Sequence, residues 1–223
     1  MGVPLSGLQG PRAVIFDLDH TVIDSAAAWS YALEEAIALV TGRRVECRRL
    51  AEAYQWRPWR DALRVVLSPR EDAGRCETLC ETMFARSAMK RLTVFDGVGM
   101  GIDRLRAARL EIGGITRHAH SLARRQIEST GIDRFLTVLS AQPPGQVWSA
   151  TTRISQCLDF LECPPSRAAF VATDRFGLSA ASGLGLRPLA AGWVVDAQPD
   201  EAAVAVPEPR ALERTICEAW LRR

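Results

Sequence analysis

Two carboxylates stand close together near the start of the chain, Asp17 and Asp19, within the stretch A-V-I-F-D-L-D-H-T-V-I-D-S of residues 13–25. The apolar run 13–16 is typical of a buried parallel strand, whose carboxyl end opens on the crevice where doubly wound sheets bind ligands. Because side chains along an extended segment alternate with a period of two, we expect Asp19 on the same side as Asp17, where it can handle protons. This arrangement suits aspartyl-phosphate chemistry, and Thr21 adds a hydroxyl donor for a phosphate oxygen.

The same stretch resembles the first motif of the haloacid dehalogenase (HAD) superfamily, and its D-L-D-x-T form resembles the phosphatase branch of that superfamily. The resemblance implies that Asp17 attacks phosphorus as a nucleophile and that Asp19 protonates the leaving group. The alternative is a strand end followed by a polar turn, because two aspartates that flank a leucine also arise by chance.

The elements that would position these acids follow two patterns. Residues 25–92 show only helical periodicity, with predicted helices at the start of the segment and at 50–54, 59–67 and 72–89, and they resemble the inserted helical cap of many HAD proteins. From residue 95 onward helix and strand alternate, with strands expected at 111–115, 135–139, 168–172 and 189–195. Among the helices expected between and after these strands are a short one at 179–182 and a closing one at 207–221. We therefore expect an α/β fold, a doubly wound Rossmann-like parallel sheet with a HAD-like core at 1–24 and 93–223 and a helical cap at 25–92.

Two later residues match further motifs of the superfamily. Thr116 ends the predicted strand I-G-G-I-T and matches the second motif, where the resemblance implies a hydroxyl that binds the phosphoryl group; the alternative is an ordinary helix cap. Asp174 follows the strand predicted at 168–172 and matches an acid of the fourth motif, while Leu178 or Ser179 stands where a second acid is common. The alternative for Asp174 is a strand-end residue that bonds to its own turn.

The third motif departs from the superfamily pattern. An ungapped match puts Trp148 where the superfamily has a lysine that neutralises the phosphoryl charge, and the single lysine of this chain is Lys90. Loss of one preorganised charge donor typically costs about a hundred- to a thousandfold in rate. Three arginines are possible substitutes for this lysine: Arg117, Arg153 and Arg175. The alternative for each is a solvated surface residue.

Magnesium is the cofactor that the resemblance implies. The ion retains waters and takes oxygens from a substrate phosphate, so few protein carboxylates are needed. The side chains of Asp17 and Asp174 and the backbone carbonyl of Asp19 would suffice as its protein ligands. The affinity for magnesium should be weaker than usual because the second acid of the fourth motif is missing.

Composition narrows the class of protein. With 223 residues, 48% of them hydrophobic, the chain can bury one sizeable core plus a modest insertion. Its net charge of +2 with interspersed signs offers no basic face for nucleic acid, and no apolar run reaches the roughly 18 residues of a membrane span. We expect a cytoplasmic protein, with no nucleic-acid or membrane partner.

The six cysteines lack C-x-x-C spacing and are expected to be small core residues: Cys47, Cys76, Cys80, Cys157, Cys163 and Cys217.

The sequence thus predicts a HAD-like hydrolase that acts on a phosphorylated small molecule through an aspartyl-phosphate. The first alternative is a catalytically impaired protein of the same fold that binds a ligand or a protein partner and regulates. Trp148 and Leu178 favour that alternative, whereas the clustered acids argue against it, since their repulsion destabilises an empty site. The second alternative is non-hydrolytic chemistry on a phosphate or diphosphate ester in the same crevice.

Overall fold

The structure, a computed structural model, describes residues 10–46, 59–194 and 203–221. The chain forms two compact units, an α/β unit of residues 1–23 and 94–223 and a helical unit of residues 24–93.

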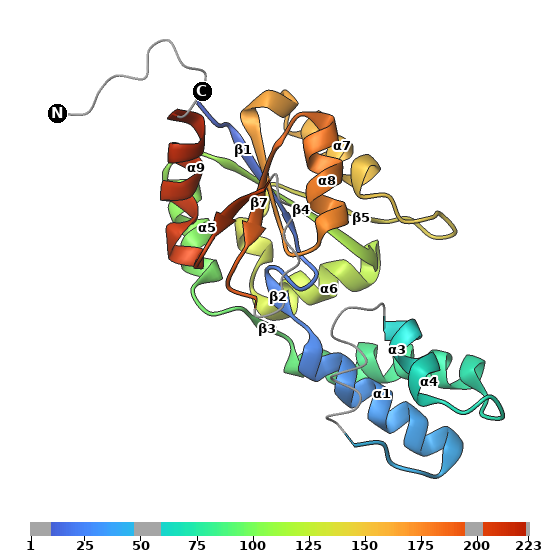
Figure 1. The fold of residues 1–223 in the computed structure, drawn as a ribbon. Coiled ribbons are helices and arrows are strands. Elements are labelled where there is room, and N and C mark those ends of the chain that lie inside the picture. The colour runs from blue at the N-terminus through green and yellow to red at the C-terminus, as the bar shows by residue number, and fades with distance from the viewer. Residues whose placement is uncertain (1–9, 47–58, 195–202, 222–223) are drawn as a thin grey trace. The chain divides into compact units, whose positions relative to one another are not determined.

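Six parallel strands form the sheet of the α/β unit in the order β5-β4-β1-β6-β7-β8 (Figure 1). Their bounds are β1 Ala13–Asp17, β4 Glu111–Ala119, β5 Val138–Gln142, β6 Ala168–Ala172, β7 Arg187–Ala191 and β8 Val204–Val206. A separate two-stranded sheet pairs β2 (Ile23–Asp24) with β3 (Thr93–Val94).

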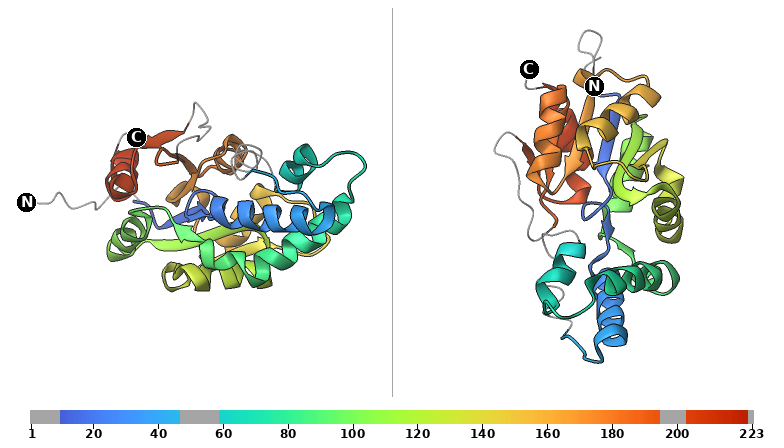
Figure 2. Two further views of the ribbon diagram at one scale, coloured as in Figure 1. Left: turned by 90° about the horizontal axis from the view of Figure 1, so that it is seen from below. Right: turned by 90° about the vertical axis from the view of Figure 1, so that its right-hand side faces the viewer.

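Helices cover both faces of the six-stranded sheet, so the fold is doubly wound as predicted. Figure 1 shows α7 and α8 on one side of the sheet and α5 and α9 on the other, and α6 packs on β4 and β5 (Figure 2 gives further views). The helices are α5 Val98–Ala107, α6 His120–Thr130, α7 Ala150–Phe160, α8 Arg175–Leu184 and α9 Leu212–Leu221, with 3₁₀ turns at Asp133–Phe135, Pro165–Arg167 and Pro209–Ala211.

Burial on both faces explains why the central strands read as continuous apolar runs. Every residue of β1 and of β6 is buried. Ile15 and Phe170 belong to the core cluster that includes Ile154 of α7 and Leu178 of α8. Strands β1 and β6 therefore form the buried centre of the sheet, and the acids of the site stand at or just after their carboxyl ends.

The strands around the second motif differ from the expected bounds. The strand expected at 111–115 continues to Ala119, and its register with β5 shifts between Thr116 and Ala119. The strand expected at 135–139 begins only at Val138, because Phe135 closes a 3₁₀ turn. Thr116 therefore lies within a strand and not at its end.

Elements of the carboxyl-terminal half were also misjudged in length. The helix expected at 179–182 is the longer α8, and the strand expected at 189–195 is β7, which ends at Ala191; Val195 lies outside the described residues. The helix expected at 207–221 divides into a 3₁₀ turn and α9, and the edge strand β8 was not predicted.

The helical unit is built on stacked aromatic rings. It contains α1 (Ala26–Thr41), α3 (Trp59–Val66), α4 (Ala73–Arg86) and the 3₁₀ turn Ala88–Arg91, whereas the helix expected at 50–54 lies outside the described residues. The Trp29 ring lies 3.8 Å from the Phe84 ring and 5.0 Å from the Trp59 ring, centroid to centroid and nearly parallel in both cases. Such pairs add roughly 0.5–1.5 kcal/mol to the burial of their surface.

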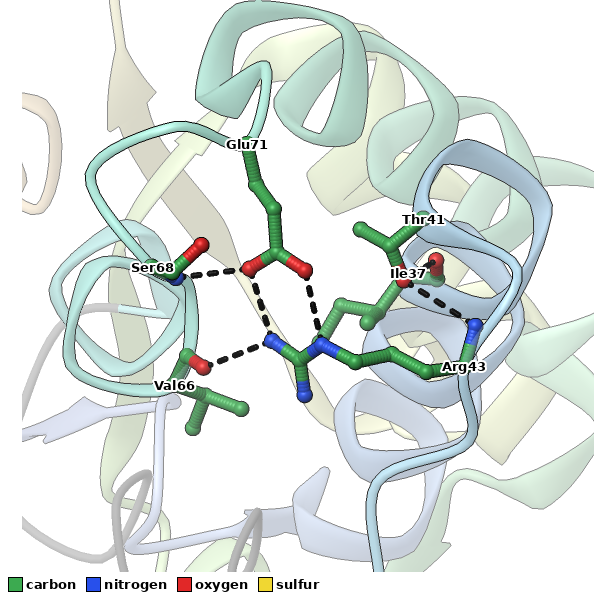
Figure 3. Close-up of polar contacts among 6 residues, drawn as sticks. All are labelled: Ile37, Thr41, Arg43, Val66, Ser68 and Glu71. Carbon is green, nitrogen blue, oxygen red and sulfur yellow. Dashed lines mark hydrogen bonds and ion pairs between the residues drawn. The ribbon is translucent and has the colours of Figure 1, made fainter.

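A polar network joins the loop after α1 to the loop before α4 (Figure 3). The Arg43 guanidinium donates from Nε and Nη2 to the two carboxylate oxygens of Glu71, both at 2.7 Å, and from Nη2 to the Val66 carbonyl at 3.0 Å. The Ser68 amide also donates to Glu71 Oε2. These hydrogen bonds, that from Arg43 first, lower the pKa of Glu71 to about 2.

Cysteine burial follows the expectation at four positions and departs from it at one. Cys76, Cys80, Cys157 and Cys163 are buried free thiols, but Cys217 is exposed on α9, so its prediction as a core residue was wrong. Cys47 lies outside the described residues. In the part of the chain that the structure describes, no helix combines the length and the apolar character that a bilayer crossing requires.

Candidate active site

Asp17 ends the central strand β1, and its side chain is buried at the carboxyl edge of the sheet. It pairs in register with Ile115 of β4, and only 4% of its surface is exposed. The backbone amide of Asp19 donates to Asp17 Oδ1 at 3.1 Å. This local turn brings the two aspartates together, although their side chains make different contacts.

Asp19 is held by the second motif, which lies on the neighbouring strand. Thr116 Oγ1 donates toward both carboxylate oxygens of Asp19, at 3.0 and 3.1 Å, and the backbone amide of Arg117 donates to Oδ2 at 2.8 Å. His118 Nε2 lies 3.6 Å from Asp19 Oδ1, and the His118 amide donates to Thr116 Oγ1. The extension of β4 past Thr116 aims these groups at Asp19, and the sequence pattern did not indicate that His118 lies close to this acid.

The loop after β1 is fixed from two other strand ends. Thr21 is fully buried, and its hydroxyl donates to Thr173 Oγ1 at 3.4 Å, at the end of β6. Trp193, which follows β7, donates from its indole nitrogen to the Thr21 carbonyl at 3.0 Å. His20 has a φ of 59°, an uncommon conformation for a non-glycine residue. Contact of the Thr21 hydroxyl with a phosphate oxygen would require exchange of its hydrogen bond to Thr173.

Asp174 is the N-cap residue of α8 and uses one carboxylate oxygen to cap that helix. Its Oδ1 accepts the backbone amides of Phe176 and Gly177, both at 3.0 Å. The other oxygen, Oδ2, lies 4.0 Å from Arg117 Nη2. One carboxylate oxygen thus remains outside the helix cap and faces a cation.

Electrostatics join the three acids into one site. The pKa of Asp17 is well above its ordinary value, first because burial disfavours the charged carboxylate and then because the negative charges of Asp19 and Asp174 lie near it. The Arg117 charge and the hydrogen bond from the Asp19 amide act in the opposite direction. The structure therefore brings Asp17, Asp19, Thr116, Arg117 and Asp174 together.

The other two candidate cations make different contacts. Arg153 is only 4% exposed, so the view of it as a solvated surface residue is wrong; its guanidinium donates to the Ala141 carbonyl and to the Gln146 side chain. The Arg175 guanidinium lies over the Phe176 ring.

Two hydrophobic residues occupy positions where the superfamily pattern has polar ones. Trp148 is partly buried against the core cluster, and Leu178 is a fully buried core residue. A cavity of about 750 Å³ lies elsewhere in the α/β unit, between the start of α5 and the end of α6, and no predicted site residue lines it.

Comparison with protein families shows which family has this fold and this arrangement of acids. The family model described as haloacid dehalogenase-like hydrolase matches residues 14–191. The chain belongs to the haloacid dehalogenase-like hydrolases. Its parallel sheet with the acids at the carboxyl edge is thus the HAD fold, and the predicted superfamily membership and fold class are confirmed.

Individual HAD relatives are distant in sequence. The tyrosine-protein kinase PtkA of Mycobacterium tuberculosis is 26% identical over 186 residues, which are 83% of this chain and 63% of that protein. This chain therefore spans less than two thirds of the length of the curated relatives that it matches.

Solved HAD structures show the same fold at low identity. A putative phosphatase from Clostridium difficile superposes with a TM-score of 0.80 at 13% identity, covering 93% of this chain and 99% of that one. The structure of PtkA from Mycobacterium tuberculosis gives 0.78 at 22% identity, with 93% and 98% covered. A putative beta-phosphoglucomutase from Thermotoga maritima gives 0.74 at 17% identity, with 93% and 99% covered.

Proposed function

We propose that the protein is a phosphoester hydrolase that cleaves a phosphorylated small molecule through an aspartyl-phosphate on Asp17. The observation that carries the proposal is the joint placement of Asp17 and Asp19 at the end of β1, with Asp19 held by the second motif. Family membership supports a hydrolytic reaction on a phosphate ester. We further take the helical unit to be the cap that selects the substrate, a phosphate or diphosphate ester.

The reaction would use the two aspartates in sequence. A carboxylate oxygen of Asp17 attacks phosphorus, the bond from phosphorus to the leaving oxygen breaks, and Asp19 gives its proton to that oxygen. Water then attacks the phosphorus of the aspartyl-phosphate while Asp19 takes up a proton from the water. The bond from phosphorus to Asp17 breaks, which releases inorganic phosphate and restores the carboxylate.

The residues present fit a magnesium ion. Asp17 and Asp174 supply carboxylate oxygens and Asp19 a backbone carbonyl, the hard oxygen donors that this ion prefers. The pKa of Asp17 is raised first by burial and then by the negative charges of Asp19 and Asp174, and a bound cation would oppose both effects. Among the described residues no group of three or more His, Cys, Asp or Glu side chains is placed to hold a metal ion, so the two carboxylates and the carbonyl would need oxygens of the substrate phosphate and of water to complete the shell. Bound there, magnesium would neutralise charge on the phosphoryl oxygens.

The nucleophile is tested by Asp17→Asn with p-nitrophenyl phosphate as substrate. We expect turnover to be abolished while circular dichroism shows an unchanged fold, whereas Asp159→Asn, an exposed acid on α7, should leave the rate as in the parent. Magnesium should raise the melting temperature of the parent by more than that of Asp17→Asn. Undiminished turnover by Asp17→Asn contradicts the mechanism.

A second function is favoured by one observation: Trp148 stands where the superfamily has its phosphate-neutralising lysine, beside a site that has lost the second acid of the fourth motif. In that case the crevice binds a phosphorylated ligand or a protein partner without turning it over. Phosphate binding by a parent protein that hydrolyses no aryl or sugar phosphate would support this function. The kinase named among the relatives suggests a variant of the first proposal, in which a hydroxyl acceptor replaces the water.

A further inference from the structure

The proposed reaction needs a cation at the transferring phosphoryl group, and this inference rests on that proposed function. Lys90, the single lysine of the sequence, lies in the helical unit, so within the α/β unit the permanent positive charge must come from arginine. A phosphoryl group in transfer carries negative charge on three oxygens, and its stabilisation is mostly electrostatic. The question is therefore which arginine faces the acids.

Contacts separate the three candidates. Arg153 is buried on α7, and its two terminal nitrogens donate to the Ala141 carbonyl and to the Gln146 side chain, at 3.1 and 3.4 Å. Arg175 stacks on its neighbour Phe176. Of the three, only Arg117 has an ion-pair contact with one of the acids of the site, with its Nη2 atom 4.0 Å from Asp174 Oδ2.

The Arg117 side chain is also accessible to a ligand. Its side chain is 45% exposed, and its Nη2 lies 4.0 Å from Asp174 Oδ2, which is the outer limit of an ion pair. Its backbone amide, in contrast, is fixed by the 2.8 Å hydrogen bond to Asp19 Oδ2. The residue is therefore anchored at the acid while its guanidinium remains available above the site.

Trp148 supplies a platform for that guanidinium. The Arg117 guanidinium carbon lies 5.4 Å from the centroid of the Trp148 ring, within the range of cation–π attraction. The indole is itself held by packing against the core cluster. The residue that stands at the position of the superfamily lysine thus lies in a loop and contacts a cation from strand β4.

We propose that the guanidinium of Arg117, held on the indole face of Trp148, is the group that binds the transferring phosphoryl group in place of the missing lysine. Arg117 is then a catalytic residue that touches the phosphoryl oxygens. Trp148 is a positioning residue that acts through Arg117. A guanidinium can donate two parallel hydrogen bonds to phosphate, which a lysine ammonium cannot match in geometry.

The first test is the affinity of the full chain for inorganic phosphate in magnesium, measured by titration calorimetry. Arg117→Met should weaken binding about tenfold or more, because hydrogen bonds to charged groups are lost, and Arg117→Lys should retain part of it. Arg124→Met, an exposed arginine on α6 that pairs with Glu128, is the control and should bind as the parent does. Unchanged affinity in Arg117→Met, or loss in Arg175→Met instead, overturns the inference.

The second test separates the platform from ordinary packing. Trp148→Phe keeps an aromatic face and should keep most of the phosphate affinity, whereas Trp148→Leu keeps only apolar bulk and should lose affinity and lower kcat more than it raises KM. Combining Trp148→Lys with Arg117→Met moves the charge back to the position of the superfamily lysine and should recover at least tenfold of what Arg117→Met loses. Equal behaviour of the Phe and Leu variants, or no recovery, counts against the platform.

The outcomes also separate this inference from the proposed function. If the parent binds phosphate through Arg117 but hydrolyses no ester, the proposed hydrolase function is refuted and the proposed role of Arg117 stands. If the parent and Arg117→Met hydrolyse esters at the same rate, the proposed hydrolase function stands and the proposed role of Arg117 is refuted. A parent without measurable phosphate binding in magnesium refutes the cation as well.

Discussion

Replacing Thr116 by valine should destabilise the α/β unit, because one buried hydroxyl organises the second motif. Thr116 is 1% exposed and its hydroxyl donates toward both oxygens of the Asp19 carboxylate. The same oxygen accepts the amide of His118 at 3.2 Å. Valine has nearly the same shape, but its side chain neither donates nor accepts a hydrogen bond. Thr116→Val therefore removes the bond to the Asp19 carboxylate and the bond from the His118 amide, with little change in packing.

The size of the loss follows from the kind of bond that is removed. A hydrogen bond to a charged group contributes about 1.5–3 kcal/mol. Asp19 keeps the Arg117 amide as a donor, so its charge is not left without a partner. We expect the free energy of unfolding to fall by about 2–3 kcal/mol, which lowers the melting temperature of a domain of this size by roughly 5–10 °C.

Urea unfolding followed by circular dichroism measures this loss, with Thr137→Val as the matched control. Thr137 also donates its hydroxyl to a carboxylate, Glu111 Oε2 at 2.7 Å, but that pair is exposed to solvent. The control should change stability by less than about 0.5 kcal/mol. Thr116→Val with the stability of the parent, or a control that loses as much, refutes the reasoning.

Two further predictions concern packing and pH. Gly101→Ala places a Cβ atom 2.6 Å from the Pro209 carbonyl oxygen and should cost about 1–3 kcal/mol in thermal unfolding, whereas Gly99→Ala, two residues earlier on α5 with 3.9 Å of space, should cost nothing; equal effects would contradict the packing. Glu71, whose pKa is lowered from 4.5 to about 2 by its hydrogen bond to Arg43, should stabilise the fold above pH 4.5 and lose that contribution as the pH falls through 2. Melting curves of the parent and of Glu71→Gln should therefore differ at pH 7 and converge in acid, and a pH-independent difference would contradict the pair.

The central strands and the order of elements were predictable because burial leaves a direct trace in the sequence. The strand at 168–172 was placed at its observed bounds and β1 to within one residue, since both are apolar runs followed by a polar turn. The continuation of β4 to Ala119 was not predictable, because polar residues after Thr116 give no apolar signal and the register shift depends on pairing with β5.

Local sequence patterns do not indicate which residues far apart in the chain contact each other. The burial of Arg153 depends on a carbonyl at the end of β5, and composition alone suggests a surface arginine. The approach of Arg117 to Trp148 joins a strand end to a loop 31 positions later, and the contact of Trp193 with Thr21 spans an even greater distance. Only the spacing of His118, two residues after the second-motif threonine, offered a sequence signal that was not used.

The central claim, that Asp17 carries the phosphoryl group, is tested most directly by a crystal structure of the full chain with magnesium and beryllium fluoride. We expect the beryllium to bond to a carboxylate oxygen of Asp17, with the metal on Asp17, Asp174 and the Asp19 carbonyl. Beryllium fluoride bound elsewhere, or an Asp17 carboxylate that stays unmodified in a crystal that holds magnesium, would contradict the claim.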